Sequence, residues 1–217
     1  SMLPVTDYDE KHFVFMATSN GTVKKTGLNN FARQRSVGLR AIELDEDDEL
    51  VGTAVTDGNK DVILVSTSGK TIRFNEADVR AMGRTARGVR GIKMAAECRM
   101  ISLIIPDDDT QILTVSETGY GKRTNIKDYP VYGRGGQGVI GMQTSERNGA
   151  VVGAVQVSEN DEIMLISDKG TLVRTRVEEV SVQGRNTQGV RLIRFKEGEK
   201  LVGLEQVDEP NDEDLVI

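Results

Sequence analysis

The chain is organised around one stretch, Tyr132-Gly133-Arg134-Gly135-Gly136-Gln137-Gly138-Val139. Its core pattern, Arg-x-x-x-Gly-Val, occurs again at 84–89 and at 185–190, which are 50 residues earlier and 51 residues later. A fainter copy, Gln34-Arg35-Ser36-Val37-Gly38-Leu39, comes before them. A motif that returns at a nearly constant interval indicates a repeat protein made of similar units.

Each unit also has the pattern of a β-hairpin, in which a short apolar run is followed by a turn with glycine and a second segment with cations. The turn glycines lie 48, 50 and 51 residues apart, and we expect them to adopt a left-handed backbone conformation. They are Gly21, Gly69, Gly119 and Gly170. An apolar pair followed by a small residue predicts a further strand in each unit, at 50–52, 100–102, 151–153 and 201–203.

Short alternating segments between the arginine loop and the apolar pair, such as 91–94 and 190–193, bring the count to about four short strands in each unit. Units of this length and content predict an all-β protein, namely a β-pinwheel or propeller-like array of four-stranded blades. A β-sandwich does not normally show a period of this length, and the coils of a β-solenoid are shorter. We expect residues 1–2 to be an expression scar, 3–207 to form the domain and 208–217 to be an acidic tail. The approximate units are 11–60, 61–110, 111–161 and 162–207.

The net charge of −6 does not exclude a nucleic-acid partner, because the carboxylates are unevenly distributed. Five of them form the run 45–49, and five more lie within 208–214. Without these ten the rest of the chain has a net charge of +4. Acidic runs are usually solvated loops or tails, and they leave room for a basic surface elsewhere.

The composition argues against several classes of function. A lone cysteine, Cys98, provides no internal disulfide and suits a reducing cytoplasm, and with one histidine, His12, a zinc site is not expected. No apolar run has the roughly 18 residues of a membrane span. None of the four tyrosines has sequence neighbours that would activate a phenol, and we find no catalytic or metal site. We therefore expect no cofactor in this chain.

Cations follow the turn glycines and occupy the arginine loops in every unit, so a blade array would place them at equivalent surfaces. Such a periodic basic stripe fits the phosphates of bent duplex DNA. The alternative is that these cations only keep the outer face of the strands soluble. The predicted DNA-binding residues are Lys24, Lys25, Arg33, Arg35, Lys70, Arg73, Arg84, Arg87, Lys122, Arg123, Arg134, Gly135, Gly136, Arg174, Arg176 and Arg185.

The glycine loop at 133–138 lacks the Gly-Lys-Ser/Thr ending of a P-loop and does not follow a strand of a βαβ unit. A mononucleotide site is therefore not expected. A plain turn between strands needs one glycine rather than four. Close approach to a phosphate backbone would use the additional glycines, and a rigid turn between blades is the alternative.

Several segments closely resemble the C-terminal domain of the A subunit of bacterial DNA gyrase, a type IIA DNA topoisomerase. One of them is Gly184-Arg185-Asn186-Thr187-Gln188-Gly189-Val190, and the others are 16–26, 80–83, 119–124, 146–149 and 170–176. The resemblance implies a six-bladed β-pinwheel, of which four blades are expected here, with a basic rim that wraps DNA. The family's box Q-R-R-G-G-K-G belongs to the first blade, and 132–138 resembles a degenerate copy of it.

The resemblance also implies a function. The domain would present wrapped duplex DNA for strand passage and so support negative supercoiling, without catalysis of its own. Implied partners are double-stranded DNA, the N-terminal breakage-reunion part of the same polypeptide and the B subunit of gyrase, in an A2B2 assembly. ATP and Mg²⁺ would act elsewhere in the parent enzyme. The parent enzyme itself would work on the nucleoid in the cytoplasm. The alternatives are the corresponding C-terminal domain of topoisomerase IV and a protein-binding propeller scaffold.

Overall fold

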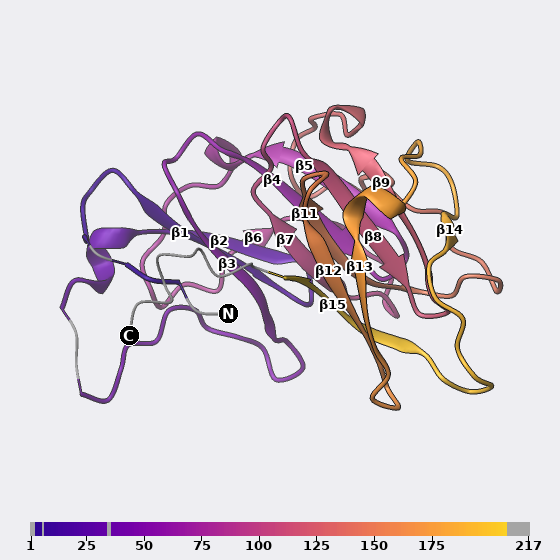
Figure 1. Ribbon diagram of the computed structural model, residues 1–217. Coiled ribbons are helices and arrows are strands. Elements are labelled where there is room, and N and C mark those ends of the chain that lie inside the picture. Colours follow the sequence, from indigo (N-terminus) through magenta and orange to yellow (C-terminus); the bar gives the residue numbers. More distant parts are fainter. Residues whose placement is uncertain (1–2, 6, 34–35, 208–217) are drawn as a thin grey trace, which may run out of the picture. The chain divides into compact units, whose positions relative to one another are not determined.

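The computed structural model describes residues 3–5, 7–33 and 36–207, and it confirms the predicted all-β fold of small antiparallel sheets (Figure 1). Arg35, the predicted scar and the predicted acidic tail lie outside the described residues. In the described part, no helix has both the length and the hydropathy needed to cross a membrane. The chain divides into two compact structural units, which are larger than the four sequence repeats. Unit 1 comprises residues up to 107 and 129–141, and unit 2 comprises the remainder.

Unit 1 contains two four-stranded sheets, in the orders β3-β1-β2-β6 and β10-β5-β4-β7. Unit 2 contains one sheet in the order β11-β8-β9-β14 and, among the described residues, a three-stranded sheet β13-β12-β15. The strands of unit 1 are β1 (Phe13–Thr18), β2 (Thr22–Gly27), β3 (Leu50–Thr56), β4 (Asp61–Ser66), β5 (Lys70–Asn75), β6 (Val89–Arg90), β7 (Met100–Ile104) and β10 (Val139–Ile140). Those of unit 2 are β8 (Gln111–Ser116), β9 (Tyr120–Asn125), β11 (Val151–Val157), β12 (Glu162–Ser167), β13 (Leu172–Arg176), β14 (Val190–Arg191) and β15 (Leu201–Val207).

The predicted hairpins are β1–β2, β4–β5, β8–β9 and β12–β13, and the first three form the two central strands of their sheets. Their turn glycines have the expected positive φ, which is 80° at Gly21, 74° at Gly69, 83° at Gly119 and 81° at Gly170. Side chains other than glycine rarely adopt this conformation, so the repeated glycine fixes where each hairpin reverses.

The fourth strand of each four-stranded sheet comes from the following sequence repeat. Strand β6 pairs with β2, β10 pairs with β5, and β14 pairs with β9. These strands have only two residues each, and each directly follows the last glycine of an arginine loop. We call β6, β10 and β14 the exchanged strands, because each pairs in the sheet of the preceding repeat and so joins consecutive repeats through backbone hydrogen bonds. The sequence period alone does not reveal this pairing.

Each unit has its own apolar core between its two sheets. In unit 1, Phe15 and Phe74 come from different sheets, and their ring centroids lie 6.5 Å apart. In unit 2, Leu113 and Leu165 belong to one buried cluster with Leu201. A small sheet cannot bury both faces alone, so packing in pairs supplies the hydrophobic stabilisation.

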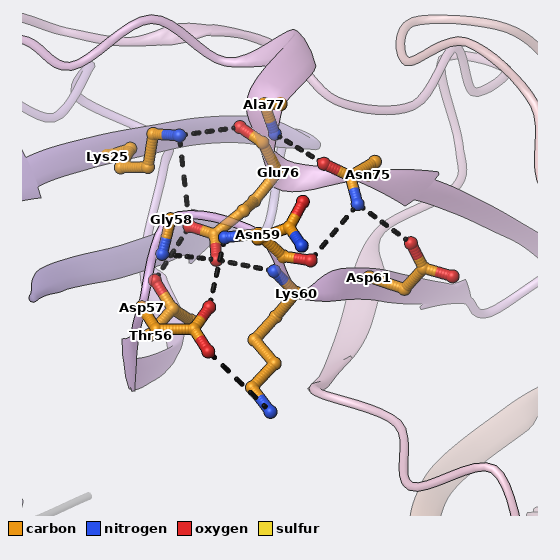
Figure 2. Close-up of polar contacts among 10 residues, drawn as sticks. All are labelled: Lys25, Thr56, Asp57, Gly58, Asn59, Lys60, Asp61, Asn75, Glu76 and Ala77. Carbon is orange, nitrogen blue, oxygen red and sulfur yellow. Dashed lines mark hydrogen bonds and ion pairs between the residues drawn. The ribbon is translucent and has the colours of Figure 1, made fainter.

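A short 3₁₀ helix follows the second strand of each hairpin: η1 (Leu28–Phe31), η2 (Glu76–Asp78), η3 (Ile126–Asp128) and η4 (Val177–Glu179). Its first residue is buried in every repeat, and this residue is Leu28, Glu76, Ile126 or Val177. Glu76 is the charged member of this set, and its carboxylate receives hydrogen bonds from several neighbours (Figure 2).

Candidate nucleic-acid interface

Two predicted DNA-binding lysines, Lys24 and Lys122, are fully buried and hold the backbone of the arginine loops. Nζ of Lys24 donates a hydrogen bond to the carbonyl oxygen of Arg84. Nζ of Lys122 donates to the carbonyl oxygen of Gly184, at 2.7 Å, and to that of Arg185. Burial, with repulsion from the nearby loop arginine, lowers the pKa of both lysines, and that of Lys122 falls to about 8. These lysines position the loops and do not face solvent.

The cations next to them, Lys25 and Arg123, are also buried. Nζ of Lys25 donates to the carbonyl oxygen of Glu76 at 2.8 Å, and Nε of Arg123 donates to that of Val180 at 2.6 Å. Each side chain therefore fastens a hairpin to the 3₁₀ segment of the next repeat. The prediction that these four cations form part of an exposed basic stripe is wrong, because the neighbouring repeat covers them and its carbonyl groups replace water.

Four further predicted cations are paired with carboxylates. Arg73 is largely buried, whereas the other three are exposed. Exposed ion pairs contribute only about 0–1 kcal/mol, so these three can exchange a carboxylate for a phosphate. The pairs are Arg73 with Asp61 (2.8 Å), Arg174 with Glu162, Arg176 with Glu162 (3.9 Å) and Glu178 (3.5 Å), and Arg87 with Asp45 (2.7 Å) and Glu43 (3.5 Å).

The remaining predicted cations with described positions reach the surface to different degrees. Arg33 and Arg134 are exposed, while Lys70, Arg84 and Arg185 are half-buried. Arg33 lies just beyond η1, and the others lie at the turn end of a hairpin or in an arginine loop.

The arginine loop of the third repeat contacts the end of η2 and the end of β6. Nε of Arg134 donates to the carbonyl oxygen of Asp78 at 2.8 Å, and its Nη1 donates to that of Arg90 at 3.1 Å. The amide of Gly135 donates to the carbonyl oxygen of Gly91 at 2.6 Å. The backbone of the loop is thus fixed, and its guanidinium lies at the surface.

The glycines of this loop have two different roles. Gly138 has a φ of 66°, and a Cβ there would lie 2.3 Å from the carbonyl oxygen of Thr71, so the fold requires this glycine. Gly133 has no heavy atom within 4 Å of a Cβ position, and Gly83 and Gly184 are equally open in the other loops. Each of these three stands directly before a loop arginine, where the fold itself does not call for glycine. The last glycine of the loop is therefore structural, and the first is not.

Sequence reasoning missed several exposed cations that the structure gathers around the same loop. The amide of Lys93 donates to the carbonyl oxygen of Gly136 at 2.8 Å, so Lys93 adjoins the glycine loop. Two surface hollows of about 340 and 330 Å³ flank Lys93; the first is also lined by Lys70 and the second by Arg90 and Arg99. We call the group Lys70, Arg90, Lys93, Arg99 and Arg134 the basic face of unit 1.

The exchanged strands provide a signal that could have identified some of these residues. Arg90 in β6 stands opposite Thr22, and Arg191 in β14 stands opposite Tyr120. In the second sheet the cation comes from the other strand, where Lys70 stands opposite Ile140. Each four-stranded sheet thus carries one cation at the same cross-strand pair, beside its turn glycine.

Comparison with known proteins agrees with this architecture. Residues 12–57, 60–97, 110–158 and 161–208 match a family described as "DNA gyrase C-terminal domain, beta-propeller". The chain belongs to this family. The resemblance inferred from the sequence is therefore confirmed.

Relatives of this family member include the A subunit of DNA gyrase from Salmonella typhimurium, which is 56% identical over 214 residues, and that from Pseudomonas aeruginosa, which is 60% identical over 206 residues. These alignments cover 99% and 94% of this chain but only 24% and 22% of the relatives. The chain thus spans about a quarter of the length of the curated relatives it matches.

Solved structures show the same fold. A DNA gyrase A C-terminal domain matches with a TM-score of 0.80 and 28% identity, over 92% of this chain and 67% of the other. The C-terminal domain of a DNA topoisomerase IV matches with a TM-score of 0.88 and 26% identity, over 95% of this chain and 65% of the other. The fold is common to both enzymes, whereas the relatives at 56% and 60% identity are gyrase subunits.

Proposed function

We propose that this chain binds duplex DNA through the sugar–phosphate backbone and bends it, as the C-terminal part of the A subunit of a DNA gyrase. The basic face of unit 1 is the observation that carries the proposal. Its five cations come from three separate chain segments, and none lies within ion-pairing distance of a carboxylate among residues 3–5, 7–33 and 36–207. Cations without a carboxylate partner, together with the open position at Gly133 beside Arg134, suit a phosphate backbone.

The energetics of this binding are electrostatic. Bending a site of 20–30 base pairs by 40–90° costs on the order of 1–6 kcal/mol. Release of counterions from each neutralised phosphate offsets that cost, and the gain diminishes as the salt concentration rises. Contacts to phosphate position the duplex without reading bases, so sequence preference is expected to be weak.

Within the complete enzyme, the bent duplex would be presented for strand passage and so support negative supercoiling. The partners would be the N-terminal breakage-reunion part of the same polypeptide and the B subunit of gyrase. This chain would supply no catalytic group, and ATP and Mg²⁺ would act on those other parts. The assembly would work on the nucleoid in the cytoplasm.

Duplex binding measured by fluorescence anisotropy across a salt series tests the proposal. The wild-type chain is compared with a triple alanine variant of Arg90, Lys93 and Arg134. The matched control replaces Lys11, Lys60 and Lys127, three exposed lysines at the other end of the hairpins, remote from the turn glycines. Loss of three phosphate contacts lowers the slope of log K against log [salt] by about 2.7 in magnitude.

We expect the wild type and the control to bind with similar steep slopes, and the basic-face variant to lose both affinity and slope. Equal behaviour of the two variants would overturn the assignment of the basic face. Failure of the wild type to bind duplex at low salt would overturn DNA binding itself and favour the protein-binding scaffold.

A further inference from the structure

Tyr120 occupies an unusual position in unit 2, because two arginines converge on its hydroxyl group. Nε of Arg147 lies 3.1 Å from the phenolic oxygen and Nη2 of Arg191 lies 2.8 Å from it, each as a hydrogen-bond donor. Both guanidinium carbons also lie 5.0 Å from the centre of the tyrosine ring. The tyrosine is buried, whereas both arginines are exposed. The context of this phenol is therefore charged, which its sequence neighbours do not reveal.

Two like charges are held close together here without a counter-charge. Since both donor nitrogens are bonded to one oxygen, they lie within about 6 Å of each other by the geometry of two hydrogen bonds. No carboxylate lies within ion-pairing distance of either arginine in the part of the chain that the structure describes. Repulsion between two guanidinium groups is relieved when an anion binds between them.

The position of Arg191 is fixed by strand pairing. Arg191 belongs to β14, and its backbone pairs with that of Tyr120 in β9. Its side chain therefore starts directly across the strand from the tyrosine, beside the turn at Gly119.

The position of Arg147 is fixed by the loop that carries it. Its carbonyl oxygen accepts a hydrogen bond from Oγ1 of Thr118, and its amide donates to Oγ of Ser145. The neighbouring Asn148 is fully buried and accepts the amide hydrogen bond of Ser145 at 2.8 Å. Binding an anion here therefore requires little further ordering of the backbone, which favours affinity.

We propose that Arg147 and Arg191, oriented by Tyr120, bind one phosphodiester group of duplex DNA; we call these three residues the Tyr120 clamp. The proposal rests on the DNA binding proposed above and adds to it a site in unit 2. Guanidinium groups suit this ligand, because their planar donors match two oxygens of one phosphate. Tyr120 is a positioning residue, since its buried hydroxyl holds the arginines and is not itself presented to the ligand.

The test measures duplex affinity of the full 217-residue chain in a salt series for the wild type and for Arg147→Ala/Arg191→Ala. Arg194→Ala is the control, because Arg194 is also exposed and lies three residues from Arg191. One phosphate contact raises log K for duplex binding by about 0.9 at 0.1 M salt relative to 1 M salt, which is about an eightfold gain in affinity. We expect the double variant to bind duplex about eightfold more weakly at 0.1 M salt. Its slope of log K against log [salt] should fall by about 0.9 in magnitude, whereas Arg194→Ala should keep the affinity and the slope of the wild type.

Tyr120→Phe separates positioning from charge. Both cations remain in this variant, so we expect the wild-type salt slope together with a lower affinity. A variant with wild-type affinity would show that the hydroxyl does not orient the arginines.

Free phosphate has the same oxygens as a phosphodiester, so a second series replaces chloride with inorganic phosphate at equal ionic strength. Phosphate that weakens duplex binding by the wild type but not by the double variant would show that the clamp takes free phosphate as well. If the wild type binds duplex and the double variant matches Arg194→Ala in affinity and slope, the clamp is overturned while DNA binding stands. If the wild type does not bind duplex, the proposed function itself fails.

Discussion

Replacing Glu76 with alanine removes the one charged group among the buried first residues of the four 3₁₀ helices described. Its carboxylate accepts a hydrogen bond from Oγ1 of Thr56 at 2.7 Å and from the amides of Gly58 and Lys60 at 3.0 and 2.8 Å (Figure 2). Nζ of Lys25 lies 3.8 Å from the same carboxylate. A single side chain thus joins the end of β3, the loop before β4 and the lysine of β2.

The cost of Glu76→Ala follows from these contacts. Two backbone N–H groups lose their acceptor, at about 1–3 kcal/mol for each that stays buried. The ammonium of Lys25 keeps the carbonyl oxygen of residue 76 but loses its counter-charge. Removing one partner of a buried ion pair typically costs about 3–5 kcal/mol, and we expect a loss of that size.

Glu76→Gln keeps the shape of the side chain and one oxygen for the amides of Gly58 and Lys60. The hydroxyl of Thr56 can rotate to accept a hydrogen bond from the new amide. The counter-charge of buried Lys25 is still lost, so we expect a cost at the lower end of the same range, about 3 kcal/mol.

Urea unfolding gives the free energies, and hydrogen exchange at Gly58 and Lys60 shows where the loss occurs. The control is Asp78→Ala, because Asp78 lies in the same 3₁₀ helix with its side chain exposed. We expect the control to stay within about 0.5 kcal/mol of the wild type. Two results would refute this account of Glu76. One is a free energy of unfolding for Glu76→Ala within about 0.5 kcal/mol of the wild type, and the other is unchanged hydrogen-exchange protection of the Gly58 and Lys60 amides.

Two further predictions concern single residues. The folded-state pKa of Lys122 is about 8, below its unfolded value of about 10.4, so the folded chain releases this proton first and the contribution of Lys122 to stability rises with pH between these values. Urea unfolding should show that the free energy of unfolding of the wild type rises by about 2 kcal/mol more between pH 7.5 and 9.5 than that of Lys122→Met. An equal pH response of the two proteins would contradict this prediction. Gly138→Ala should lower the melting temperature, because its positive φ and the 2.3 Å approach to the carbonyl oxygen of Thr71 both oppose a Cβ, whereas Gly133→Ala should leave the melting temperature unchanged.

The sequence predicted the hairpins well, because a turn glycine after an apolar run is a local signal. It did not predict burial of Lys24 and Lys122, because the second strand of a hairpin that carries cations normally faces water. The carbonyl oxygens that replace water come from Arg84 and Gly184, which are 60 and 62 residues farther along the chain. No local pattern shows such partners. The two-residue strand β6 escaped prediction for the same reason, since pairing with β2 alone makes it a strand.

Two groups of cations in this chain have different proposed roles. Buried ones such as Lys24 and Arg123 replace water with backbone carbonyl groups and connect one repeat to the next. Exposed ones such as Arg90 and Arg191 lie on the exchanged strands, without a carboxylate partner among the residues that the structure describes. The first group fixes the arginine loops and the second provides charge beside them, so the proposed DNA-binding surface depends on both. Because every exchanged strand completes the sheet of the preceding repeat, a cation on such a strand is positioned by two repeats at once, and so more firmly than a cation on a flexible loop.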